Sequence, residues 1–109
     1  MAVVGVLGSR PDFSLQMTHN GDGSVDLDAR EAREHERYRW AELWRIEGDQ
    51  PYGYFELHEV TTDWPVIFYA QPLGYSYRVA LVSESEPDDD DETTHSIYAR
   101  STPVMAHLP

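Results

Sequence analysis

The chain has 109 residues, of which 40% are hydrophobic and 12% aromatic, enough for one packed domain and too few for two. Its net charge of −12, with eight arginines and no lysine, repels nucleic-acid phosphates and argues against direct DNA or RNA binding. The absence of cysteine excludes a disulfide framework, a thiolate zinc site and a cysteine nucleophile.

Residues 1–12 contain a short apolar segment interrupted by glycines, and its apolar members are Val3, Val4, Val6 and Leu7. The segment has no basic region before it and is too short to span a bilayer. We therefore expect neither a signal peptide nor a membrane anchor. Two interpretations stay open: a first edge strand, or an arm that docks on a neighbouring molecule, because exposed apolar termini are seldom left free.

The next segment predicts a β-hairpin. Phe13–Met17 alternates apolar and polar residues, and Ser24–Asp28 alternates again through Val25 and Leu27. Between them lies Asn-Gly-Asp-Gly at 20–23, a strong turn signal because Asn and Gly adopt positive φ at low cost. This loop also suggests calcium, with Asn20 and Asp22 as the first two ligands of an EF-hand, but Gly23 follows Asp22 directly and the third ligand is missing. A plain turn is therefore favoured.

The middle of the chain changes from a charged segment to an aromatic strand. Segment 28–37 has a helix-forming composition but almost nothing apolar to bury, so we expect a charged loop with at most one or two helical turns. From Tyr38 the period is that of a strand, with Tyr38, Trp40, Trp44 and Ile46 on one face. We interpret the tryptophans, including Trp64, mainly as core or sheet-packing residues; an exposed carbohydrate-binding platform is the alternative.

The second half predicts four further strands. They are expected at Tyr52–Val60, Pro65–Tyr69, Tyr75–Glu86 and Ser96–Arg100. The third has the clearest pattern: Tyr77 and its alternate neighbours face one way, and Arg78 and Ala80 face the other. It follows a Pro/Gly turn at 71–74, and residues 102–109 are expected to be a C-terminal tail.

Five adjacent carboxylates follow the long strand: Asp88, Asp89, Asp90 and Asp91, then Glu92. Successive side chains alternate in direction, so they converge on one ion only in a tight loop. A solvated loop is favoured. A weak divalent-ion site and a contact for a basic partner are the alternatives.

No catalytic constellation is present in the sequence. The five histidines are scattered without metal-ligand spacing, and neither a nucleophile elbow nor a dinucleotide fingerprint occurs. We therefore assign no catalytic, cofactor-binding or metal residue, and expect a protein that is not an enzyme and needs no cofactor.

Three motifs together resemble a family. They are Ala41-Glu42-Leu43-Trp44-Arg45-Ile46-Glu47-Gly48, Phe68-Tyr69-Ala70-Gln71-Pro72-Leu73-Gly74, and Tyr75-Ser76-Tyr77-Arg78-Val79-Ala80-Leu81-Val82. The stretch is similar to fibronectin type III-like modules, above all those of virion proteins of tailed bacteriophages. The resemblance covers less than half of the chain. It implies binding and assembly without catalysis, and a tyrosine, Tyr75 or Tyr77, that caps a corner of the sandwich.

About seven short strands with turn signals between them predict an all-β chain: a single immunoglobulin- or fibronectin III-like β-sandwich of antiparallel strands over 13–101, with flexible terminal arms at 1–12 and 102–109. The expected function is that of a structural subunit of a phage particle, located in the virion and, before assembly, in the host cytoplasm. Its partners would be other virion proteins and copies of itself, with no nucleic acid, membrane or small-molecule substrate. The expected contacts are the apolar arm (Val3, Val4, Val6, Leu7), the acidic loop (Asp88–Asp91) and the outer sheet face. The alternative is an acidic inhibitor or anti-defence protein that mimics nucleic acid.

Overall fold

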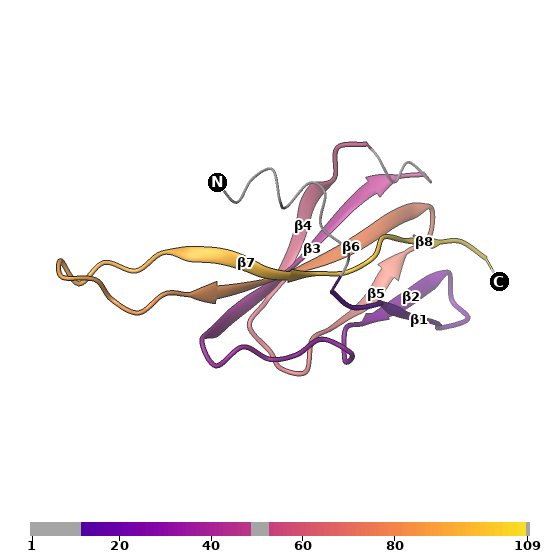
Figure 1. Ribbon diagram of the computed structural model, residues 1–109. Helices are drawn as coiled ribbons and strands as arrows, with labels where there is room; N and C mark the ends of the chain where they lie inside the picture. The colour runs from indigo at the N-terminus through magenta and orange to yellow at the C-terminus, as the bar shows by residue number, and fades with distance from the viewer. Residues whose placement is uncertain (1–11, 49–52, 109) are drawn as a thin grey trace.

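The computed structural model describes residues 12–48 and 53–108, which form eight β-strands in two antiparallel sheets (Figure 1). The three-stranded sheet has the order β1 (Gln16–His19), β2 (Ser24–Asp28), β5 (Ile67–Pro72). The five-stranded sheet has the order β4 (Glu56–Thr61), β3 (Tyr38–Glu47), β6 (Tyr75–Glu84), β7 (His95–Arg100), and β8 (Val104–Ala106) also pairs with β6. Among the residues described, no helix meets the length and hydropathy that a membrane crossing needs.

The core lies between the two sheets. The three-stranded sheet contributes Val25, Leu27 and Phe68, all essentially inaccessible. The opposite wall consists of alternate residues of β3 and β6, namely Ala41, Leu43, Tyr77, Val79 and Leu81. The predicted all-β sandwich of antiparallel strands is confirmed.

The ends of the sandwich differ from the prediction. Phe13 does not belong to the first strand, because it makes a parallel bridge to Ser101 and its carbonyl accepts the Thr102 amide at 3.1 Å. This contact separates β7 from β8, so the last strand is split in two. The segment 102–109, expected to be a free tail, thus supplies β8 to the five-stranded sheet. The arm 1–12, apart from Asp12, lies outside the described residues.

The charged segment after β2 is a loop without helix, as expected. Two alanines of this loop, Ala29 and Ala32, are nevertheless buried against the core. Arg37 fixes the end of the loop: its Nε donates to the Glu84 carbonyl at 2.7 Å and its Nη2 to the Ser85 carbonyl at 2.9 Å. The loop is thereby attached to the far end of β6.

Tyr77 takes the corner role that the resemblance implied. Its ring is fully buried, and its hydroxyl donates to the Pro72 carbonyl at 2.5 Å, five residues upstream. Tyrosine corners of β-sandwiches make this type of contact. The bond joins the end of β5 to the start of β6 and so connects the two sheets.

A β-bulge joins β2 to β5. Asp26 lies opposite two residues, Tyr69 and Ala70, and Ala70 adopts a left-handed φ of 55°. The Asp26 Oδ1 accepts the Ala70 amide and the Asn20 side-chain amide, each at 2.9 Å. In the same turn, the Asp22 carboxylate accepts the Ser24 amide at 3.0 Å. The carboxylate of the candidate calcium loop, Asp22, and the nearby Asp26 thus both accept hydrogen bonds from the protein itself.

Tyr77→Phe removes the corner hydrogen bond and is expected to lower the free energy of unfolding by about 1–2 kcal/mol at neutral pH. Burial raises the pKa of the Tyr77 hydroxyl from 10.0 to about 12. As the pH rises, the unfolded chain therefore loses the hydroxyl proton of residue 77 before the folded chain does. The free energy of unfolding is unaffected below pH 10 and falls by on the order of 2 kcal/mol as the pH rises towards 12. Urea unfolding across this range should show a smaller alkaline loss in the variant. Tyr69→Phe, at an exposed ring, is the control; an unchanged alkaline loss in Tyr77→Phe would contradict the assignment.

Ala70→Gly is expected to raise the free energy of unfolding by about 0.5–1 kcal/mol. Relief of the left-handed backbone contributes roughly 1–2 kcal/mol, and the greater freedom of glycine in the unfolded chain offsets part of it. Urea unfolding measures the change. Ala99→Gly, in β7 without positive φ, should lose stability, and a loss at residue 70 as well would refute the bulge argument.

Candidate functional site

The side of β6 that faces away from the core is also apolar. Cross-strand partners place Trp40 beside Val82, Glu42 beside Ala80, and Trp44 beside Arg78. Ala80 and Val82 are only 4% and 3% exposed, although they point away from the core. β6 is therefore nearly continuously buried, which is typical of strands covered on both sides rather than of a sandwich strand with one solvated face.

The apolar surface continues to the neighbouring strands. On β4, Leu57 pairs with Trp44 and Val60 with Glu42; on β7, Ile97 pairs with Val82. Leu57 and Val60 are each 49% exposed, so the surface becomes accessible toward the sheet edge. We call this surface the outer face: Trp40, Glu42, Trp44, Leu57, Val60, Arg78, Ala80, Val82, Ile97 and Arg100.

Glu42 organises the two tryptophans of the outer face. The Trp40 indole donates to its Oε2 at 2.9 Å, and the Trp44 indole donates to its Oε1 at 3.1 Å. Trp40 also packs against His95, with ring centroids 4.7 Å apart. One carboxylate thus satisfies two indole donors and holds both rings over the sheet, which makes this surface ordered before any partner binds.

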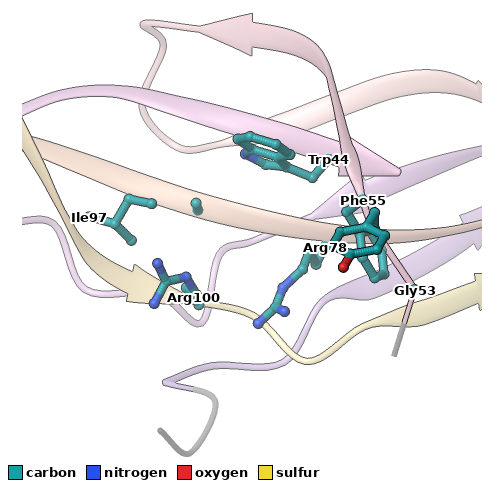
Figure 2. A pocket seen from close by; sticks show the side chains of 8 residues that line it. Trp44, Gly53, Phe55, Arg78, Ile97 and Arg100 are labelled. Atoms are coloured by element: carbon teal, nitrogen blue, oxygen red, sulfur yellow. The ribbon is translucent and has the colours of Figure 1, made fainter. Parts of the chain in front are cut away.

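A hollow of about 330 Å³ lies on the outer face. It is lined by Trp44, Gly53, Tyr54, Phe55, Arg78, Ala80, Ile97 and Arg100. Figure 2 shows aromatic and aliphatic side chains around it and the guanidinium groups of Arg78 and Arg100 on the same side. The guanidinium carbon of Arg78 is 5.9 Å from the centre of the Phe55 ring, within the range of a cation–π contact.

The two arginines are an unusual pair in so acidic a chain. Among the described residues, no carboxylate lies within 4.0 Å of either guanidinium. Burial, and then the charge of Arg100, lower the pKa of the Arg78 guanidinium. Its Nη2 donates one long bond, 3.4 Å, to the Ser101 carbonyl. Most N–H donors of the two guanidinium groups therefore have no carboxylate acceptor among the described residues.

Of the three tryptophans, which were predicted to be core or sheet-packing residues, only Trp64 reaches the core between the sheets. Trp64 packs against the core, and its ring centroid lies 5.0 Å from that of Tyr38. Trp40 and Trp44 instead lie half-buried on the outer face. A bulge after Tyr38 shifts the register of β3 against β6, so Tyr38 turns inward while Trp40 turns outward. The inward positions of β3 belong to Ala41 and Leu43.

The residues predicted from the sequence as contacts lie elsewhere. Val3, Val4, Val6 and Leu7 fall outside the described residues. Asp88, Asp89, Asp90 and Asp91 are exposed at the tip of the β6–β7 hairpin, which extends beyond the rest of the sandwich (Figure 1). The Asp88 Oδ1 accepts the Asp90 amide at 2.8 Å and the Glu92 amide at 3.0 Å, which closes the loop. Within the described part of the chain, no three His, Asp or Glu side chains are grouped as metal ligands.

The residues that form the outer face were not predicted from the sequence. Two signals could have found it: Val82 continues the alternate series that begins with Arg78 and Ala80, and each set of alternate residues in β3 contains apolar or aromatic members, Trp40 and Trp44 in one and Ala41 and Leu43 in the other. A strand with no clearly polar side predicts cover on both sides. The arginine pair gives no such signal, because Arg78 and Arg100 are neighbours only across the β6–β7 register.

Glu42→Ala should disturb the outer face selectively. Both indoles lose their acceptor, so we expect the free energy of unfolding to fall by about 1–2 kcal/mol and tryptophan emission to move to longer wavelength. Urea unfolding and fluorescence spectra measure the two effects. Glu56→Ala, an exposed carboxylate on β4, is the control and should change stability by less than about 0.5 kcal/mol. Equal effects of the two substitutions would contradict the bridging role.

No protein-family model matches the chain, and neither a curated protein nor a solved structure matches it.

Proposed function

We propose that the protein is a non-catalytic binding module that acts by protein–protein contact, with the outer face as the surface that meets its partner. The observation that carries the proposal is the apolar cover on both sides of β6, with Ala80 and Val82 buried on the side away from the core. A sandwich needs one apolar side of each sheet for its own core. The second apolar side is not needed for that core, and its exposed members Leu57, Val60 and Ile97 can be covered by a partner.

Several features of this surface suit a protein interface. It combines tryptophan, aliphatic and arginine side chains, and tryptophan and arginine are enriched among residues that dominate binding energy. Leu57, Val60 and Ile97 form an exposed rim around the half-buried indoles. Contiguous apolar patches on soluble proteins commonly mark interaction sites.

The assembly that we propose for this module is a bacteriophage particle, in which it would be a tail or head accessory subunit that contacts other virion proteins and copies of itself. This part of the proposal rests on the motifs that resemble virion modules. The two-sheet architecture and the Tyr77 corner are in keeping with that resemblance.

A second candidate function, mimicry of nucleic acid by an acidic inhibitor, has one observation in its favour. Asp89, Asp90 and Asp91 present exposed carboxylates at the tip of the β6–β7 hairpin. A basic partner bound by them would lose affinity steeply as salt rises. Contact through the apolar outer face should depend only weakly on salt, and this difference separates the two functions.

Site-specific photo-crosslinking tests the proposed function. A benzophenone amino acid is placed at Leu57 or Ile97 on the outer face, and at Tyr69, 65% exposed on the other sheet, as the control. The variants are expressed in the cells or particles in which the protein naturally occurs. We expect a defined adduct with a partner protein from both outer-face positions, several-fold above that from residue 69.

Far-UV circular dichroism confirms that each variant is folded. Adducts that form equally from all three positions, or from Tyr69 alone, would overturn the proposed function.

A further inference from the structure

Building on the proposed function, we propose that the hollow beside Arg78 and Arg100 recognises a single carboxylate of the partner protein, carried next to an apolar or aromatic side chain. The hollow is formed by β3, β6, β7 and the segment before β4 (Figure 2). Its volume of about 330 Å³ is at the lower end of the roughly 300–1,000 Å³ typical of ligand pockets, suited to a few side-chain groups rather than a large ligand.

The first observation is the charge around the hollow. The chain holds 20 acidic residues and eight arginines, so carboxylate partners are plentiful. Two arginines are nevertheless adjacent on the outer face, with no described carboxylate within 4.0 Å. Like charges side by side and partly desolvated are unfavourable. A bound anion would relieve that repulsion.

The shape of the donors selects a carboxylate. A guanidinium presents its N–H groups in a planar fork that matches two carboxylate oxygens, and such charge-assisted bonds are stronger than neutral ones. Arg78 and Arg100 project from neighbouring strands, and Ala80 lies directly across from Arg100. The small alanine leaves room between the two guanidinium groups and the sheet.

The rest of the lining selects what accompanies the carboxylate. Trp44, Phe55 and Ile97 present apolar surface in the same hollow, which would bury an apolar or aromatic side chain. The net charge of −12 repels extended negative surfaces. The charge therefore favours one carboxylate in an otherwise uncharged segment over nucleic acid or the acidic loop of a second copy.

A displayed library of random peptides tests this specificity on the full chain. We expect enriched peptides to share an Asp or Glu beside an aromatic or aliphatic residue. Replacing the shared Asp by Asn, or the shared Glu by Gln, in a synthetic peptide should weaken binding at least about tenfold. Arg78→Gln and Arg100→Gln should weaken it similarly. Arg30→Gln is the control: it removes one positive charge as well, but from a side chain that follows β2 and pairs with Asp28. This variant should bind the peptide as the wild type does.

Circular dichroism checks that every variant folds; if Arg78→Gln does not, the peptide substitution and Arg100→Gln still decide the question. Enriched peptides without a shared carboxylate, arginine variants that bind normally, or a library that yields no binder would each overturn the inference. Equally tight binding of a peptide copied from residues 84–94 would place a second copy's acidic loop there and overturn it too. If arginine-independent peptides still shift the indole signal of Trp44, the inference fails while the proposed function stands; if outer-face crosslinks are absent, the proposed function itself fails.

Discussion

Strand β6 carries apolar side chains on both of its faces, and the rest of the structure depends on how each face is covered. Tyr77, Val79 and Leu81 are covered by the three-stranded sheet, and this contact makes the sandwich. Ala80 and Val82 lie on the other side, next to the strand that carries Trp40 and Trp44, whose indoles both donate to Glu42. The second cover is one side chain thick and ends in the half-exposed Leu57 and Val60. The apolar side chains of the core are therefore fully buried, whereas those of the outer face are only partly buried. This incomplete burial is the reason for regarding the outer face as a binding surface.

The strands themselves follow well from sequence, because short-range alternation and turn chemistry decide where a strand lies. β2 and the start of β6 occur where alternation places them, and the Asn-Gly turn before β2 has the positive φ at Gly21 and Gly23 that such a turn needs. The assignment of faces does not follow. Each side of β3 carries both apolar and charged residues, with Glu42 between Trp40 and Trp44 on one side and Arg39 and Arg45 around Ala41 and Leu43 on the other. Period two therefore defines two faces without saying which is inward. The core already contains Tyr77 and Phe68, its largest fully buried side chains, and the smaller Ala41 and Leu43 pack inward beside them. The bulge after Tyr38 and the split between β7 and β8 arise from contacts distant in sequence, which local patterns do not encode.

The proposed function depends on the contrast between the overall charge of the chain and the local charge of the outer face. The whole chain is strongly acidic, and its most concentrated carboxylates lie at the hairpin tip. The outer face is different: its one carboxylate, Glu42, accepts hydrogen bonds from two indoles, and Arg78 and Arg100 lie beside an apolar hollow. Long-range repulsion then disfavours acidic surfaces and nucleic acid, while short-range contacts favour an apolar segment with a single negative group. The outer face can thus be selective although it has no deep cavity.

If the outer face is the binding surface, it becomes buried when the protein meets its partner. Hydroxyl-radical footprinting of the isolated chain and of the chain in its natural assembly measures this directly, because tryptophan and tyrosine oxidation reports side-chain exposure. We expect that Trp40 and Trp44 are oxidised in the isolated chain and protected in the assembly, while Tyr69 on the opposite sheet reacts equally in both. Protection of Tyr69 with unchanged oxidation of the two tryptophans would contradict it.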